Sequence, residues 1–417
     1  MSRILISGGR KLYGTVTVQG AKNAILPLLA ATLLADGVSI IDNCPELSDV
    51  SVSADILTEL GCTVIRNKNT ISVDTANANR YSISDELMRK MRSSIVFLGA
   101  IASRNGIAVM SSPGGCELGP RPIDIHISSL KKLGMTFTEK NGRIICRAEH
   151  IHGADVTLPL PSVGATENLI LAAVKASGIT RIINAAREPE VSDLANFLNS
   201  CGARISGQGT GEITIIGVEK LTACRYRAIP DRIVAATYMC AVAAAGGAVR
   251  IKGAQEKHLS AVISCLREAG CRFEFSDGAI TVSQSSRPSA IERTDTVYYP
   301  GFPTDAGSPL ISVMCVANGT SVLVENIFEN RFRVADELVR MGASVRTSGR
   351  VAVVNGVKAL HGARVCASDL RAGAALVIAG LCAEGTTEIS GVGYIDRGYE
   401  AIEKTFGELG ADIKRVD

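Results

Sequence analysis

The segment Leu130-Lys-Lys-Leu-Gly-Met-Thr-Phe137 ends an amphipathic helical pattern with a glycine and continues into a β-rich run. Similar segments recur along the chain, for example at 55–64 and 338–345. Glycine favours the left-handed conformation that closes a helix, and the β-branched residues that follow it are typical of strands. The stop glycines are Gly61, Gly134, Gly202, Gly270, Gly342 and Gly410, with spacings of 73, 68, 68, 72 and 68 residues. This period predicts six copies of one α/β unit.

A second helical pattern lies about 25 residues before each stop glycine and is apolar on nearly every face. In a soluble protein such a helix must be buried on all sides. Three units can surround their own three helices, so six units predict two domains of like construction. The six apolar segments are 24–31, 94–101, 169–174, 233–240, 309–316 and 374–381.

The last unit is shorter than the others, because only seven residues follow Gly410. The N-terminal stretch 3–18 resembles the strand pair expected at 143–158, so we infer that residues 1–21 complete the final unit. The expected domains are therefore 22–229 and 1–21 together with 230–417. A chain of 417 residues is also long enough for two cores.

The composition excludes several classes of function. A net charge of +3, with 4% aromatic residues and no Trp, gives little support for nucleic-acid binding. We also expect no membrane partner and no secretory signal, because the apolar stretches are short and the N-terminus reads as a strand. The 12 cysteines form no Cys-x-x-Cys pair and show no zinc spacing, so we expect a reducing cytoplasm and neither metal nor cofactor.

Polar residues recur at the starts of the apolar helices. A helix start attracts anions, so a cation there opposes helix stability unless an anionic ligand is present. The alternative is local pairing, as Asp231 with Arg232 or Asp369 with Arg371. That alternative is reasonable for one position and weaker for a set in register. The residues are Lys22, Arg92, Thr166, Arg232, Asp305 and Arg371.

Cys116 lies in a loop rich in glycine and proline, Ser111-Ser-Pro-Gly-Gly-Cys-Glu-Leu-Gly-Pro-Arg-Pro122. Among the cysteines it is the one that we expect outside packed surroundings, and Arg121 would favour its thiolate. Spacing alone leaves a reactive thiol and an incidental one equally supported. No motif pairs Cys116 with a histidine, His126 included, so a papain-like hydrolase is poorly supported.

Three further segments carry charged residues that are candidates for a functional role. Asp305 follows a Pro-rich turn at a helix start, where the alternative role is a simple N-cap. Arg331 and Arg397 could each bind phosphate or carboxylate, although isolated arginines more often form surface ion pairs.

Nine motifs, in order and along essentially the whole chain, resemble the UDP-N-acetylglucosamine 1-carboxyvinyltransferase family. That family comprises enolpyruvyl transferases of bacterial peptidoglycan synthesis. The resemblance implies an inside-out α/β prism with two domains that close over substrate. The motifs are Gly20-Ala-Lys-Asn23, Met91-Arg-Ser-Ser94, Pro113-Gly-Gly-Cys116 with Gly119–His126, Ser162-Val-Gly-Ala-Thr166, Asn184–Glu190, Gly301-Phe-Pro-Thr-Asp305, Ile327–Phe332, Asp369-Leu-Arg-Ala372 and Asp396-Arg-Gly-Tyr-Glu400.

The resemblance also implies the reaction and the residues that carry it out. Phosphoenolpyruvate is protonated at C3, the sugar 3′-hydroxyl attacks C2, and phosphate leaves from a tetrahedral intermediate without a metal. Cys116 would be the proton donor, able also to form an adduct with phosphoenolpyruvate or fosfomycin, and Asp305 would be the base. Lys22, Arg121 and Arg397 would hold phosphoenolpyruvate, with added charge from Arg92, Arg331 and Arg371. The nucleotide sugar would contact Asn23, Arg121, Pro122, Ile123, Asp124, Ile125, Ser162, Val163, Gly164, Asp305 and Ile327.

Four departures from the family pattern accompany these motifs. Val234, Gly307 and Tyr394 replace a common Glu, Gln and His, and Arg333-Val334 replaces a usual Met-His pair. They would suit a divergent second copy of the enzyme, and those at Val234, Gly307 and Tyr394 are the only support for a regulator that binds nucleotide sugar without turnover. The other alternative is the shikimate-3-phosphate enzyme of the same fold, against which the Cys116 loop argues. No obligate protein partner is evident.

Overall fold

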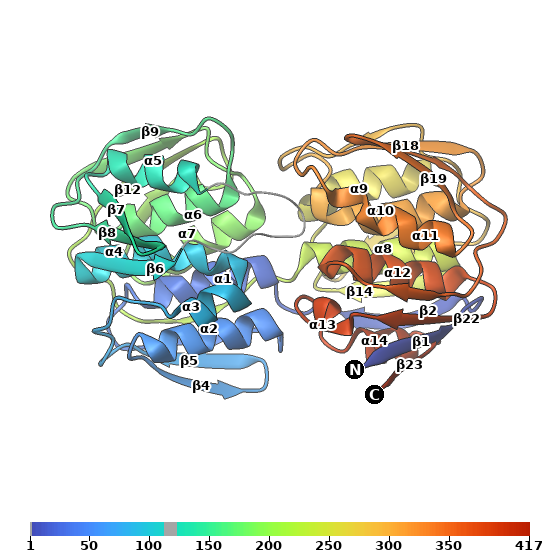
Figure 1. The fold of residues 1–417 in the computed structure, drawn as a ribbon, viewed down its shortest axis with the longest axis horizontal. Coiled ribbons are helices and arrows are strands. Elements are labelled where there is room, and N and C mark those ends of the chain that lie inside the picture. Colours follow the sequence, from blue (N-terminus) through green and yellow to red (C-terminus); the bar gives the residue numbers. More distant parts are fainter. Residues whose placement is uncertain (1, 112–122) are drawn as a thin grey trace. The chain divides into compact units, whose positions relative to one another are not determined.

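The computed structural model describes residues 2–111 and 123–417. Contacts within the chain divide this part into two compact units. The first unit comprises residues 20–111 and 123–229, and the second comprises residues 2–19 and 230–417. With one exception, each repeat in the two units has the same pattern: a buried central helix, a strand, an outer helix, two strands of a hairpin and a short strand (Figure 1). In the first repeat of the first unit, an isolated bridge between Ser82 and Val109 takes the place of the short strand.

The first unit has α1, α4 and α6 as its central helices and α2, α5 and α7 as its outer helices. α1 packs against α4, and α4 packs against α6. In chain order its elements are α1 (Lys22–Thr32), β3 (Val38–Asp42), α2 (Ser48–Glu59), β4 (Thr63–Asn67), β5 (Thr70–Asp74), α3 (Asp85–Lys90), η1 (Arg92–Val96), α4 (Phe97–Asn105), β6 (Ile107–Ser111), α5 (Asp124–Lys132), β7 (Thr136–Lys140), β8 (Arg143–Arg147), β9 (Asp155–Thr157), α6 (Val163–Ala173), β10 (Ile179–Ile183), α7 (Pro189–Ser200), β11 (Arg204–Ser206), β12 (Glu212–Ile216) and β13 (Arg225–Arg227).

The second unit has α8, α10 and α12 as its central helices and α9, α11 and α14 as its outer helices. Its elements are β1 (Arg3–Ser7), β2 (Leu12–Thr17), α8 (Arg232–Ala245), β14 (Gly247–Lys252), α9 (Glu256–Glu268), β15 (Arg272–Ser276), β16 (Ala279–Gln284), β17 (Thr294–Asp295), α10 (Thr304–Val316), β18 (Thr320–Val324), η2 (Arg331–Arg333), α11 (Val334–Arg340), β19 (Ser344–Ser348), β20 (Val351–Asn355), β21 (Arg364–Cys366), α12 (Leu370–Cys382), β22 (Thr386–Ser390), α13 (Val392–Ile395), α14 (Ile402–Glu408) and β23 (Asp412–Val416).

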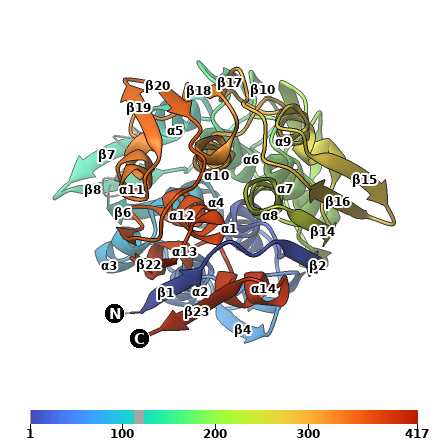
Figure 2. The same cartoon turned by 90° about the vertical axis from the view of Figure 1, so that its right-hand side faces the viewer.

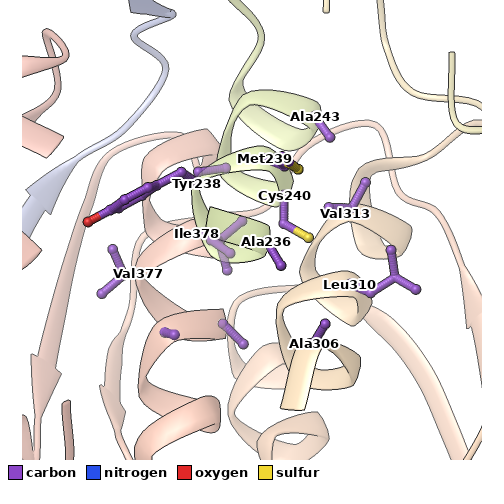
Figure 3. Packing of buried hydrophobic residues seen from close by; sticks show 14 of the residues in the cluster. Ala236, Tyr238, Met239, Cys240, Ala243, Ala306, Leu310, Val313, Val377 and Ile378 are labelled. Atoms are coloured by element: carbon purple, nitrogen blue, oxygen red, sulfur yellow. The ribbon is translucent and has the colours of Figure 1, made fainter. Parts of the chain in front are cut away.

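The central helices are buried along almost their whole length, as their composition predicts. Every residue of α12 from Arg371 to Leu381 is buried. α8, α10 and α12 pack against one another, and the sheets of the second unit surround them (Figure 2). Small and branched side chains fill the space between these helices, among them Ala236, Leu310 and Ile378 (Figure 3). The inside-out α/β architecture is therefore present in this unit.

The sheets are closed by a short strand that crosses from one repeat to the next. β13 pairs in parallel with β3, so the third repeat of the first unit joins the first repeat. β2 pairs in parallel with β14 in the same way. β1 lies between β22 and β23 and is antiparallel to both, so an N-terminal strand completes the last sheet (Figure 1).

The six stop glycines share one backbone conformation. Their φ angles lie between +88° at Gly134 and +103° at Gly202, the left-handed region that glycine adopts without penalty. The predicted helix ends are thus confirmed. None of the described helices is both long enough and apolar enough to cross a membrane.

Candidate active site

The first turns of the central helices carry the polar residues that the sequence places in register. A helix start presents free N–H groups and a partial positive charge, so these positions favour anions. The side chain of Arg92 lies outside what the structure describes. The residues are Lys22 in α1, Arg92 in η1, Thr166 in α6, Arg232 in α8, Asp305 in α10 and Arg371 in α12.

Asp305 lies between two buried arginines. Its Oδ2 accepts a hydrogen bond of 3.0 Å from Nη2 of Arg371, and its Oδ1 accepts one from Nη2 of Arg331. Burial alone would raise the pKa of this carboxyl, but the charges and hydrogen bonds of Arg371 and Arg331 outweigh it. The pKa therefore lies below its ordinary value of 3.8. Asp305 binds arginines rather than capping α10, whose N-cap residue is Pro303.

Arg371 is held from two further directions. Its backbone N–H donates to Oδ1 of Asp369, while its Nη1 donates to the hydroxyl of Tyr399 at 3.2 Å. The Tyr399 hydroxyl is also bonded to Thr237 of α8 at 2.8 Å. Burial opposes the charged form of Arg371, but the Asp305 carboxylate compensates, and the pKa of Arg371 lies above its ordinary range. Asp369 therefore binds the backbone N–H of Arg371 and not its guanidinium, which points to Asp305.

Lys22 forms a buried ion pair in the first unit. Its Nζ lies 2.7 Å from Oδ2 of Asp49, which belongs to the first turn of α2. Both residues are more than nine-tenths buried. Asn23, the next residue in α1, is exposed. A cation is therefore fixed at this helix start by a carboxylate that the sequence analysis did not identify.

The start of α5 is tied to α6 by a buried histidine. Nδ2 of Asn168 lies 2.9 Å from Nδ1 of His126, and Oδ1 of Asn168 accepts the N–H of Gly99. That second bond fixes the amide orientation, so the ring Nδ1 is an acceptor. Burial lowers the pKa of His126 from 6.5 to about 4, so the ring is neutral at pH 7.

The predicted nucleotide-sugar residues of the first unit occupy two helix starts. Ile123 is the N-cap of α5, and Asp124 and Ile125 form its first turn. Ser162 caps α6 with an Oγ that accepts from the Ala165 N–H, and Val163 and Gly164 follow it. These residues are half-buried, apart from the exposed Asp124.

Two predicted residues of the second unit lie in loops of that unit. Ile327 is half-buried and follows β18, and its N–H donates to Oε1 of Glu325 at 2.8 Å. Arg397 is half-buried and lines a shallow surface depression with Gly391, Gly393 and Tyr394. Arg331 is 3% exposed, so it is no surface ion-pair residue.

Cys116, Arg121 and Pro122 lie outside the described residues. The described cysteines are free thiols, and Cys240 and Cys315 are fully buried in central helices. Cys366 is exposed at the end of β21, because it points away from the core side of its sheet. The exposed Cys366 contradicts the expectation that every cysteine other than Cys116 lies in packed surroundings.

Three supporting residues escaped the sequence analysis: Asp49, Tyr399 and Glu325. Each is buried and polar and contacts a predicted site residue or its neighbour. A signal existed for Glu325, a carboxylate directly after the strand Thr320–Val324. Tyr399 lies within the motif quoted for Arg397. Nothing in the local sequence of Asp49 distinguishes it from an ordinary acidic residue in the first turn of a helix.

The departures from the family pattern fit the packing of the structure. Val234 is fully buried in the first turn of α8, and its N–H donates to Asp231. A Cβ atom at Gly307 would meet Leu323 at 3.5 Å and Oε2 of Glu325 at 4.0 Å, which are ordinary contact distances. Among the described residues, no group of His, Cys, Asp and Glu is arranged to hold a metal ion.

Comparisons with known proteins agree with this architecture. The family model of EPSP synthase (3-phosphoshikimate 1-carboxyvinyltransferase) matches residues 6–406. UDP-N-acetylglucosamine 1-carboxyvinyltransferase 2 of Caldanaerobacter subterraneus subsp. tengcongensis is 51% identical, with 100% of both chains covered. The enzyme named UDP-N-acetylglucosamine 1-carboxyvinyltransferase in Trichlorobacter lovleyi is 46% identical over 100% of this chain and 99% of its own.

Two solved structures share the fold. The enolpyruvyl transferase NikO from Streptomyces tendae is 24% identical with a TM-score of 0.89, over 100% of this chain and 99% of its own. EPSP synthase from Acinetobacter baumannii is 19% identical with a TM-score of 0.76, over 100% of both chains. From the full-length matches, the chain belongs to the enolpyruvyl transferase family of EPSP synthase and, within it, to the UDP-N-acetylglucosamine 1-carboxyvinyltransferases.

Proposed function

We propose that this chain transfers the enolpyruvyl group of phosphoenolpyruvate to the 3′-hydroxyl of UDP-N-acetylglucosamine and releases phosphate. This would be the first committed step of peptidoglycan precursor synthesis, carried out in the cytoplasm. The observation that carries the proposal is the set of charged residues at the central helix starts, in a chain 51% identical throughout to an enzyme with that name.

The two substrates are polyanions, and the buried cations match them. Lys22 and Arg371 are each held in one orientation by a buried partner, so they would meet a phosphate or carboxylate without reorganisation. Such preorganised charge stabilises the charge-rich tetrahedral intermediate more than bulk water would. Arg121 and Arg397 would complete the binding of phosphoenolpyruvate, with Arg92 adding charge.

Asp305 would accept the proton of the 3′-hydroxyl as that oxygen attacks C2. The two arginines make it a weak base, because they lower its pKa. The negative charge of a substrate bound beside Arg331 or Arg371 would offset part of that effect and raise the basicity of Asp305. In this way the carboxylate would become an effective base only when phosphoenolpyruvate is bound. Cys116 would supply the proton that C3 receives, and C3 would lose a proton when phosphate leaves.

The test is phosphate release from phosphoenolpyruvate. We expect release that depends on UDP-N-acetylglucosamine and is lost in Cys116→Ala. Release driven by shikimate-3-phosphate would instead identify the other enolpyruvyl transferase activity. Tight binding of UDP-N-acetylglucosamine without release would identify a nucleotide-sugar regulator. Fosfomycin should also alkylate one thiol, Cys116, faster in the presence of UDP-N-acetylglucosamine, whereas labelling of Cys366 would contradict the assignment.

A further inference from the structure

We propose that Glu325 is a positioning residue for the nucleotide sugar, which holds the start of α10 and the loop after β18 in one arrangement. This inference rests on the proposed function, because Asp305 and Ile327 are the residues expected to contact UDP-N-acetylglucosamine. Glu325 directly follows β18 and is 1% exposed. Among the described residues, the hydrogen bonds of its carboxylate reach none that is assigned to phosphoenolpyruvate.

One carboxylate receives four hydrogen bonds from three segments. Oε1 accepts the N–H groups of Ile327 at 2.8 Å and Phe328 at 3.0 Å, which fixes the loop. Oε2 accepts the hydroxyl of Thr304 at 2.9 Å, which fixes the first residue of α10. The hydroxyl of Thr296, after β17, also donates to Oε1 at 3.0 Å. Bonds to an ionised acceptor are stronger than neutral ones, so this carboxylate ties the segments firmly together.

The direction of these bonds is determined by a neighbouring contact. The N–H of Asn326 donates to Oγ1 of Thr296 at 2.9 Å, so the Thr296 proton is directed to Glu325. The Asn326 side chain donates to the Thr296 carbonyl at 3.1 Å. The loop after β18 is thus bound both to Glu325 and to Thr296, which itself donates to Glu325.

The arrangement determines which groups can meet a ligand. The Ile327 N–H is used by Glu325, so its carbonyl oxygen and side chain remain for the nucleotide sugar. Thr304 is fixed on one side by Glu325, and its carbonyl accepts from Nε of Arg331 on the other. Asp305, the next residue, is therefore held through both its backbone neighbour and its own carboxylate. Loss of Glu325 should release both contacts to the sugar nucleotide together.

The test compares two steady-state constants in the full chain. Glu325→Gln keeps the shape but removes the charge, and we expect the KM for UDP-N-acetylglucosamine to rise about tenfold, the scale of one weakened charge-assisted bond. The KM for phosphoenolpyruvate should stay within about twofold, because none of the described residues assigned to its binding shares a hydrogen bond with Glu325. Equal changes in both constants, or a lower melting temperature with neither changed, would show a purely structural role.

A pair of variants at Thr304 tests the same contact in case Glu325→Gln fails to fold. Thr304→Val removes the hydroxyl that donates to Oε2, whereas Thr304→Ser retains it, so only the valine variant should raise the KM for UDP-N-acetylglucosamine. Thr320→Val is the matched control, because Thr320 lies at the start of β18 and donates to Asn355 at an exposed site. If Thr304→Val behaves like Thr320→Val, the proposal is overturned.

One binding measurement distinguishes an error in the proposed function from an error in the role of Glu325. Calorimetric titration of the unaltered chain with UDP-N-acetylglucosamine tests the proposed function, and no binding there would overturn both. Binding by the unaltered chain, with equal affinity in Glu325→Gln and Thr304→Val, would overturn only the role of Glu325.

Discussion

The two units treat the starts of their central helices in opposite ways. In the second unit each central helix has a carboxylate at its start: Asp231 and Asp369 cap α8 and α12, and Asp305 lies in the first turn of α10. In the first unit, α1 and α6 have no acidic residue in the first turn, and α1 begins with Lys22.

This difference indicates where an external anion would be most favourable. A carboxylate in the protein neutralises the partial positive charge of a helix start, and the second unit supplies its own. In the first unit the cation Lys22 has no carboxylate at its own helix start and is balanced by Asp49 from an outer helix. Both units therefore have cations at central helix starts, but among the described residues only the second holds a carboxylate of a central helix between two arginines.

The largest effect should come from Arg371→Ala in the second unit. Asp305 loses one of its two arginines, and the Tyr399 hydroxyl loses its donor. We expect kcat/KM for phosphate release to fall at least about 100-fold, the usual result of removing a preorganised charge. The free energy of unfolding should fall by about 3 kcal/mol, because a buried ion pair is broken.

The matched control is Arg364→Ala. Arg364 pairs with Glu388 at 3.5 Å, but its side chain is 88% exposed, so neither quantity should change. Similar losses in both variants would show that the effect reflects net charge and not the arrangement around Asp305.

In the first unit, variants of Lys22 distinguish its contribution to stability from its contribution to activity. Lys22→Met leaves Asp49 buried without this partner, so the free energy of unfolding should fall by about 3 kcal/mol. The double variant Lys22→Met, Asp49→Leu replaces the pair with apolar side chains and should regain most of that stability. Phosphate release should remain absent in both. Urea unfolding and the phosphate assay measure the two quantities, and recovered activity in the double variant would contradict the catalytic role of Lys22.

The units should also differ in their response to acid. The neutral His126 has a folded pKa of about 4, and an unfolded chain binds a proton there below 6.5. Its contribution to stability is therefore complete above pH 6.5 and is lost as the pH falls towards 4. The shift corresponds to about 3 kcal/mol. Urea unfolding of His126→Gln should show the difference from the unaltered chain shrinking by this order between pH 6.5 and 4.

Asp305→Asn provides the contrast in the second unit. The folded pKa of Asp305 is depressed, so its contribution is present above its ordinary value of 3.8 and is lost only as the pH falls below that value. The stability difference between Asp305→Asn and the unaltered chain should stay constant from pH 6.5 to 4. A gain in stability of the unaltered chain relative to Asp305→Asn as the pH falls across that range would place the folded pKa of Asp305 above its ordinary value.

The sequence predicts the scaffold better than the site because the two depend on different distances along the chain. Gly61 and its equivalents end helices through local backbone conformation, and the apolar segments identify buried helices by composition. The partners of Asp305 come from 26 and 66 residues away, and no local pattern links them. Asp49 approaches Lys22 only when α1 and α2 pack together. The partners in these ion pairs could therefore be identified only from the structure. The position of the charged residues at helix starts could be predicted from the sequence.

The smallest expected effect is a difference in unfolding free energy between alanine substitutions at a stop glycine of the first unit and at one of the second. Gly61 and Gly410 have φ angles of +100° and +95°, so alanine at either position costs about 1 kcal/mol from backbone strain. At Gly61 the added Cβ would lie 2.4 Å from the carbonyl oxygen of Asn77, and the backbone would have to shift. At Gly410 its nearest neighbour would be the Lys11 carbonyl oxygen at 3.8 Å, an ordinary contact.

We therefore expect Gly61→Ala to lower the free energy of unfolding by about 2 kcal/mol and Gly410→Ala by about 1 kcal/mol, since only the first adds a clash to the strain. Urea unfolding at pH 7 measures both. Gly202→Ala is the control within the first unit, because its φ is +103° and a Cβ there would meet nothing within 4 Å. If Gly202→Ala matches Gly61→Ala, the cost belongs to the first unit as a whole. If it matches Gly410→Ala, the left-handed conformation costs the same in both units, and the contact with Asn77 accounts for the additional cost at Gly61.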